Sequence, residues 1–129
     1  MQNMTIGDTA RQAGVRPSTI RYYESIGLLP VPYKVNGQRR YDPTILQTLG
    51  VIQLAQHAGF TISEIETLFN DFSVDTPASA RWQALATTKL TEIEALIKRA
   101  NAMKHLLEAL LDCRCQKLED CVGPQETVS

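Results

Sequence analysis

The sequence STIRYYESIGL, residues 18–28, is the most informative segment of the chain about its fold. Pro17 suits the first turn of a helix over this stretch, because its φ is already helical and its missing N–H would be unbonded there anyway. Apolar and polar residues fall on different faces at helical spacing. We expect an inward face of Ile20, Tyr23 and Leu28, and an outward face or edge of Arg16, Ser18, Arg21 and Tyr22.

A shorter helix precedes this one. Thr5 and Asp8 have capping-box spacing at its start, and Gly14 marks its end. Two short helices that are joined by a tight turn containing glycine are typical of a helix-turn-helix motif. The first 28 residues therefore predict such a motif.

Residues 29–41, LPVPYKVNGQRRY, predict a small β-hairpin. Asn36-Gly37 is a strong signal for a two-residue turn, because both residues tolerate positive φ. The tip and the return strand carry Lys34, Arg39 and Arg40. The hairpin is expected to be the wing of a winged helix-turn-helix domain.

Two more helices are expected behind the wing. Asp42-Pro43 predicts the start of a helix that ends near Gly59. A further helix is expected from Ser63, because Ser63 and Glu66 have capping-box spacing. Residues 71–77 are expected to form a hinge.

A long helix is expected to follow the hinge. No glycine or proline occurs between Ala78 and Leu111, and apolar residues recur there in steps of three and four, interrupted only by Lys89. A helix of about 34 residues spans roughly 50 Å, which is too long for the front of the chain to cover. We expect it to form an antiparallel coiled coil with a second copy, giving a homodimer. The alternative is a helix that folds back over its own domain.

The composition is that of an ordinary globular protein, with 129 residues and a formal net charge of −1. No stretch is apolar enough to span a membrane and the start does not resemble a signal peptide, so we expect a cytoplasmic protein without a membrane partner. The charge is unevenly distributed: residues 1–42 hold six basic and three acidic side chains, and residues 43–129 hold seven basic and 11 acidic ones. A basic front is typical of a segment that binds phosphates.

Basic and polar side chains on the second helix and on the wing predict binding to double-stranded DNA. Arg21 has the length and the fork geometry to bind guanine or phosphate. The alternative is a solvated basic face, which the order of helix-turn-helix, hairpin and basic wing disfavours. The expected DNA-binding residues are Arg16, Ser18, Arg21, Tyr22, Lys34, Arg39, Arg40 and Tyr41.

All three cysteines lie directly after the long helix. Cys113, Cys115 and Cys121 are the only thiols of the chain, and they fall within nine positions. Three thiolates in one loop can converge on a soft cation, such as zinc or another thiophilic metal. The alternatives are reduced thiols without a function and a purely structural zinc clip.

The motifs Thr5-Ile6-Gly7, residues 18–28 and residues 38–41 resemble the MerR family of transcription regulators. The resemblance implies a dimer that binds a palindromic operator in a promoter with an overlong spacer. It also implies that effector binding distorts the DNA so that RNA polymerase can use the promoter. By the same resemblance, Arg21 is the principal recognition contact, Tyr22 contacts the backbone, the wing contacts are Arg39, Arg40 and Tyr41, and Tyr23 and Glu24 hold the recognition helix in place.

The sensor loop is most similar to that of the SoxR group within this family. Its three cysteines coincide with three of the four cluster ligands of that group, but the fourth position falls at Leu110, which makes an iron–sulfur cluster the less favoured cofactor. Mercury-, zinc- and lead-sensing relatives place a cysteine at the start of the dimer helix, and the matching position here is Ser79. His105 is a further candidate ligand, one or two helical turns before Cys113.

The sequence thus predicts a mainly α-helical regulator in three parts: a winged helix-turn-helix DNA-binding domain over 1–75, a dimerisation helix over 76–111 and a cysteine-containing effector loop and tail over 112–129. We expect it to bind DNA and to respond to a thiophilic metal. A redox regulator of the SoxR type and a coiled-coil adaptor without DNA binding are the alternatives. An enzyme is disfavoured, because the chain has no Cys-x-x-Cys, no βαβ pattern and no His–Cys constellation.

Overall fold

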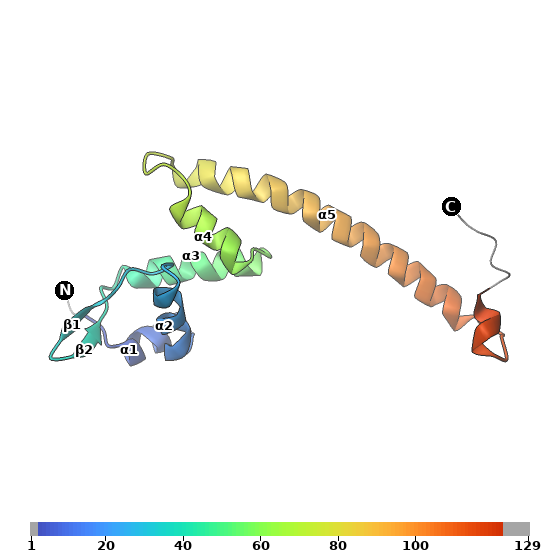
Figure 1. The fold of residues 1–129 in the computed structure, drawn as a ribbon, viewed down its shortest axis with the longest axis horizontal. Helices are drawn as coiled ribbons and strands as arrows, with labels where there is room; N and C mark the ends of the chain where they lie inside the picture. Colours follow the sequence, from blue (N-terminus) through green and yellow to red (C-terminus); the bar gives the residue numbers. More distant parts are fainter. Residues whose placement is uncertain (1–2, 123–129) are drawn as a thin grey trace. The chain divides into compact units, whose positions relative to one another are not determined.

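The computed structural model of the protein describes residues 3–122 and is mainly helical, with one two-stranded hairpin (Figure 1). Residues 123–129, the end of the expected effector segment, lie outside the described part. The chain divides into two compact units, Met1–Lys89 and Leu90–Ser129. The elements are α1 (Ile6–Ala13), α2 (Pro17–Ser25), β1 (Tyr33–Val35), β2 (Gln38–Arg40), α3 (Ile45–His57), α4 (Ile62–Asn70), α5 (Ala78–Leu111) and the short 3-10 helix η1 (Leu118–Cys121).

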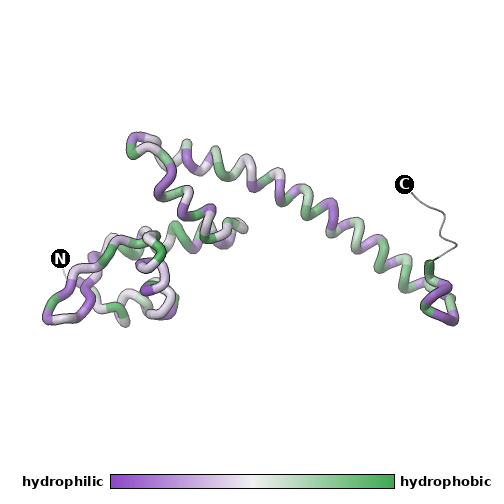
Figure 2. Tube along the Cα trace, in the orientation of Figure 1, coloured by the Kyte–Doolittle hydropathy of each residue, from purple (hydrophilic) through white to green (hydrophobic). Residues whose placement is uncertain are grey.

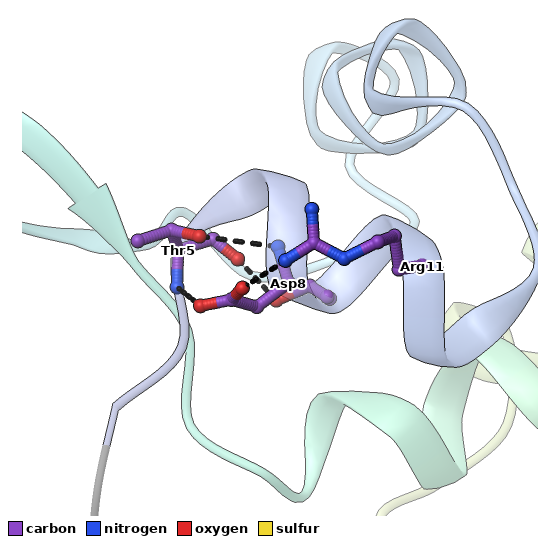
Figure 3. A network of polar contacts seen from close by, with 4 residues as sticks. Thr5, Asp8 and Arg11 are labelled. Carbon is purple, nitrogen blue, oxygen red and sulfur yellow. Dashed lines mark hydrogen bonds and ion pairs between the residues drawn. The ribbon is translucent and has the colours of Figure 1, made fainter.

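Helices α1 and α2 form the expected helix-turn-helix. The Thr5 hydroxyl accepts a hydrogen bond from the Asp8 N–H (3.1 Å), and the Asp8 carboxylate accepts one from the Thr5 N–H (3.4 Å). Figure 3 shows this capping box together with the ion pair between Asp8 and Arg11. Gly14 ends α1 at φ 71°, a left-handed conformation that glycine adopts without strain. The predicted start and end of α1 are both confirmed.

Replacing Thr5 by alanine is expected to lower the free energy of unfolding by about 1 kcal/mol, because the amide of Asp8 loses its capping acceptor. Urea denaturation followed by circular dichroism measures this change. Thr44→Ala is the matched control, since Thr44 occupies the N-cap of α3 but its side chain makes no capping hydrogen bond. Equal losses in the two variants would contradict a capping role for Thr5.

The apolar face of α2 packs into the core of the first unit. Ile20 is fully buried, and Tyr23, Leu28 and Leu29 are buried beside it, as their spacing predicts. Helix α3 completes this core with Leu49 and Ile52, and its Gln53 amide donates a hydrogen bond to the carbonyl of Ala13 at the end of α1 (2.8 Å). The core therefore holds the helix-turn-helix on α3 and leaves the opposite face of α2 in solvent.

The wing is an antiparallel hairpin with a two-residue turn. Val35 pairs with Gln38, and Asn36 and Gly37 between them have φ values of 52° and 79°. Both values lie in the left-handed region, as a type I′ turn requires. The N-terminal segment extends this hairpin, because Met4 and Tyr41 exchange backbone hydrogen bonds of 2.9 and 2.8 Å. The predicted hairpin is thus confirmed.

Helices α3 and α4 begin at other residues than the sequence predicts. Helix α3 starts at Ile45, and the Asp42 carboxylate accepts the N–H of Thr44 (2.9 Å) in a turn before it. Helix α4 is capped by Thr61 with Glu64, so the prediction that it begins at Ser63 with Glu66 is wrong by two residues. Ile65 and Leu68 are buried on the inner face of this helix.

Helix α5 has nearly the predicted bounds, and the boundary between the two compact units falls within it, after Lys89. Figure 2 shows that hydrophobic positions recur along α5 between hydrophilic ones. In the second unit many large apolar side chains of α5 are exposed: Leu90, Leu96, Ile97, Met103, Leu106, Leu107, Leu110 and Leu111. No helix within residues 3–122 has both the length and the apolar character needed to cross a membrane.

Candidate DNA-binding surface and metal centre

Helix α2 presents its polar face to solvent. Arg16 occupies the N-cap, Ser18 lies in the first turn, and Arg21 follows one turn later, all exposed. Tyr22 is 52% exposed, and its ring lies 6.0 Å from that of the buried Tyr23. These four expected DNA-binding residues thus lie on the accessible side of α2.

A groove between α2 and the wing brings three of the basic residues together. It is lined by Arg21 from α2 and by Lys34 and Arg39 from the two strands. A second depression joins Lys34, Arg39 and Arg40 to the start of α1. The recognition helix and the wing therefore form one basic surface, although Arg21 and Arg39 are far apart in the sequence.

Glu24 holds the wing against α2. Its side chain is 8% exposed, and its carboxylate accepts hydrogen bonds from the Arg39 Nε (3.2 Å) and from the Tyr41 hydroxyl. Burial, and then the hydrogen bond to the Glu24 carboxylate, raise the pKa of Tyr41 well above its usual value. The Tyr41 hydroxyl therefore keeps its proton and stays a donor at any physiological pH.

The wing residues differ in their access to solvent. Lys34 is exposed, and Arg39 and Arg40 are half-buried. Tyr41 is only 2% exposed, because its ring packs into the core and its hydroxyl is bound to Glu24. Tyr41 therefore joins the wing to α2, and its expected contact with DNA stays a prediction.

Replacing Glu24 by glutamine is expected to lower the free energy of unfolding by about 1–2 kcal/mol, because two hydrogen bonds to a mostly buried carboxylate are weakened. It is also expected to weaken DNA binding, because Arg39 loses the partner that orients it. Thermal unfolding and a DNA-binding titration measure the two effects. Glu108→Gln, at an exposed site on α5, should change neither; an unchanged Glu24→Gln protein would exclude the anchoring role.

The three cysteines converge in the second unit. Their Sγ atoms all lie within 4.8 Å of one another, and all three side chains are exposed. Cys113 follows the end of α5, and η1 folds the chain back so that the Cys121 Sγ lies 3.8 Å from the Cys113 Sγ. The Cys115 N–H donates to the Cys113 Sγ at 3.4 Å. The predicted clustering of these thiols is thereby confirmed.

The contacts within the cluster make its thiols unequal. The N–H of Cys115 and the neighbouring thiols lower the pKa of Cys113 below its usual value. Hydrogen bonding of the Cys115 thiol to Cys113, and then to Cys121, raises the pKa of Cys115 to about 11. Cys113 therefore ionises more readily than Cys115, and a cation that binds all three must displace a proton from Cys115.

The donor set fits a single soft cation and does not fit an iron–sulfur cluster. Over residues 3–122, the group of candidate ligand atoms consists of three sulfurs, whereas a two-iron, two-sulfur cluster takes four protein ligands. Leu110 has no donor atom. His105 is exposed on α5 and lies outside that group, and Ser79 lies in the first turn of α5 in the other unit. Their roles as additional ligands stay predictions.

Arg81 is a structural residue that the sequence did not suggest. Its guanidinium donates to the carbonyls of Leu68 and Phe69 in the last turn of α4, and to those of Ser73 and Thr76 in the following loop, at 3.1 to 3.3 Å. One side chain thus donates hydrogen bonds to backbone carbonyl groups at the C-terminus of α4 that have no partner within the helix. The same side chain also holds the loop that leads into α5. No local sequence pattern around Arg81 predicts these hydrogen bonds.

Lys89 is the second such residue, and here the sequence held a signal. It interrupts the apolar series of α5, and its side chain is buried (8% exposed). The Nζ lies 2.9 Å from a carboxylate oxygen of Glu64 and 5.5 Å from the centre of the Phe60 ring, which also packs on Trp82. Lys89 therefore attaches the first part of α5 to α4.

Comparison with known proteins assigns the family. The sequence matches the family model described as MerR HTH family regulatory protein over residues 4–71, and the model described as MerR, DNA binding over residues 46–110. The chain belongs to the MerR family. Transcription regulator HmrR of Rhizobium leguminosarum bv. viciae is 34% identical over 119 residues, covering 92% of each chain. CueR of Salmonella typhimurium is 32% identical over 120 residues, covering 92% of this chain and 87% of that protein.

A solved structure of a transcription regulator is similar over most of the chain. It is the transcription regulator PbrR691 from Ralstonia metallidurans CH34 in complex with lead(II), with a TM-score of 0.72 and 28% identity. The similarity covers 90% of this chain and 92% of that chain. The predicted fold class, a winged helix-turn-helix followed by a long helix, is confirmed for this MerR-family member, and the chain is a DNA-binding transcription regulator and not an enzyme.

Proposed function

We propose that this MerR-family protein is a homodimer that binds a palindromic promoter operator and responds to a thiophilic metal ion in its cysteine loop. The observation that carries the proposal is the convergence of three exposed sulfurs within 4.8 Å, in a chain whose other end is a winged helix-turn-helix. The lead(II) complex of PbrR691 supports a metal as the class of effector.

We assign the DNA contacts to the surface that α2 and the wing form together. Arg21 reads the major groove, because it is exposed on α2 and its guanidinium matches the paired acceptors of guanine. The other residues of this surface contact the DNA phosphates: Arg16, Ser18, Tyr22, Lys34, Arg39 and Arg40. Tyr41 acts through Glu24 by positioning the wing.

The exposed apolar side chains of α5 are assigned to a second copy of the chain. A row of leucines, Ile97 and Met103 along one helix is too large an apolar surface to stay in water, and its three-and-four spacing is that of a coiled coil. An antiparallel pair gives two-fold symmetry, which a palindromic operator matches. RNA polymerase is the further partner, since a regulator at a promoter acts on transcription through it.

The cysteine loop suits a responsive site better than a structural clip. Structural zinc sites are closed by four protein ligands, whereas this cluster offers three exposed sulfurs. An open, exposed site lets a metal enter and leave, as a sensor requires. Zinc and other thiophilic cations are the candidate effectors.

The proposal is tested by selecting operators from a random pool of double-stranded DNA with the native protein. The selected site is then titrated with and without zinc, copper(I), mercury(II) and lead(II). We expect a palindromic site that is bound by two chains, and a metal that changes the bound complex. A selection that yields no common sequence, or a complex with one chain, would contradict the proposal.

The salt dependence of operator binding reports the number of phosphate contacts. A dimer that neutralises about three phosphates per protomer should show a log–log slope of about −5. Lys34→Ala should reduce the magnitude of the slope by about 2, because two equivalent contacts are lost. Fluorescence anisotropy at several salt concentrations measures both slopes; Lys98→Ala, at an exposed position of α5 in the other unit, is the charge-matched control. A slope near zero would rule out the DNA-binding surface.

A further inference from the structure

Cys113 and Cys121 face each other across the cysteine loop with their Sγ atoms 3.8 Å apart. This is contact distance between two unbonded sulfurs, and a disulfide brings the atoms to about 2.0 Å. Both side chains are exposed free thiols, open to a dissolved oxidant. We propose that Cys113 and Cys121 form a reversible intrachain disulfide when a peroxide reaches the metal-free loop, and that this bond prevents the loop from binding a metal ion.

The local structure favours this pair. Cys113 lies just beyond α5 and Cys121 at the end of η1, and every residue from Asp112 to Val122 is exposed, so that the sulfurs can approach without displacing any buried group. Only seven residues separate the two cysteines, which keeps the cost of closing the ring small. Cys115 is only two residues from Cys113, and its N–H donates to the sulfur of Cys113. We expect Cys115 to remain a free thiol.

The reaction balances with hydrogen peroxide as the oxidant. One thiolate of the pair attacks a peroxide oxygen, forming an S–O bond as the O–O bond breaks and hydroxide leaves. The second thiolate then attacks the sulfenic sulfur, forming the S–S bond as the S–O bond breaks. The two protons of the thiols and the two oxygens leave as two water molecules. Two sulfurs lose one electron each, and the peroxide gains two.

A metal ion and an oxidant therefore compete for the same sulfurs of the loop. This inference rests on the proposed metal response. A disulfide consumes two of the three sulfurs, and the remaining thiol of Cys115 cannot hold a cation alone. Conversely, a cation bound to the thiolates occupies the electron pairs with which they would attack peroxide. Metal occupancy should therefore protect the pair, and oxidation should abolish metal uptake.

The experiment uses the full-length protein and its tryptic peptides. Trypsin cleaves after Lys104, Arg114 and Lys117, so the three cysteines fall into three different peptides: 105–114, 115–117 and 118–129. Metal-free protein is treated with hydrogen peroxide, its free thiols are counted, and the unreduced digest is analysed by mass spectrometry. We expect free thiols to fall from three to one per chain, peptide 105–114 to be linked to 118–129, and dithiothreitol to restore all three thiols.

Two cysteine variants and zinc complete the test. Cys115→Ser should still form the bond and lose both remaining thiols, whereas Cys121→Ser should give no linked pair. Protein that is first loaded with zinc should keep its thiols. Unchanged thiols in the metal-free protein, a bond through peptide 115–117, or a bond between two chains would overturn the proposal. If the bond forms in a protein that binds no metal, the oxidation site stands and the proposed metal response fails.

Discussion

Replacing Arg21 by alanine should lower operator affinity by about 30-fold or more. One bidentate arginine–guanine contact contributes about 1–3 kcal/mol, and a dimer makes it in both half-sites. Arg21 is exposed on α2 and is not part of the hydrophobic core, so the fold should survive the substitution. Anisotropy titration with the selected operator measures the loss, and thermal unfolding checks the fold.

Two further variants sharpen this test. Arg21→Lys keeps the charge but loses the planar fork, so it should retain binding to nonspecific DNA while losing discrimination against altered half-sites. Arg99→Ala removes the same charge from an exposed position of α5 in the other unit and should leave the affinity unchanged. Equal affinity losses for Arg21→Ala and Arg99→Ala would show that only total charge matters, which would exclude Arg21 as a reader of sequence.

Replacing any one of Cys113, Cys115 and Cys121 by serine should lower metal affinity by about 100-fold. Four ligands of a structural zinc site together give an apparent 10–16 kcal/mol, which corresponds to about 3 kcal/mol per ligand. Serine keeps the size of the side chain but does not ionise at neutral pH, so that two thiolates remain. Competition of the metal-loaded protein with a chromophoric chelator measures the change.

The same variants should leave operator binding without metal intact, because the cysteines lie in the other compact unit from α2 and the wing. Asp112→Asn is the matched control: it changes a residue of the same loop that lies outside the sulfur cluster. We expect it to keep native metal affinity. If a single serine variant binds metal as tightly as the native protein, the three sulfurs do not form one site.

Local signals predicted the parts of the fold that local interactions determine. Asn36-Gly37 predicts the hairpin of the wing, because its turn needs only two residues that tolerate positive φ. The start of α4 was predicted two residues late, since Thr61 with Glu64 and Ser63 with Glu66 both fit the capping pattern. Either start places Ile65 and Leu68 on the buried face of α4, so neither the capping pattern nor the apolar spacing distinguishes the two pairs.

The parts of the sites that depend on distant contacts were not predictable in the same way. The resemblance suggested that Glu24 holds the recognition helix, but its partners Arg39 and Tyr41 lie 15 and 17 residues away and meet it only in the folded domain. Two of the four carbonyls that Arg81 binds, those of Ser73 and Thr76, likewise come from a loop whose path the sequence does not specify. The cysteine cluster was predictable because its three members are close in sequence, although the turn of η1 that returns Cys121 was not.

A metal in the cysteine loop should change what the DNA-bound protein does at a promoter. In vitro transcription from a promoter that contains the selected operator measures this effect, with the native protein and Cys113→Ser compared across thiophilic metals. We predict that a metal which binds the native protein changes the transcript yield, and that Cys113→Ser does not respond. Bound metal without any change in yield, or the same response in both proteins, would show that the cysteine loop does not control transcription.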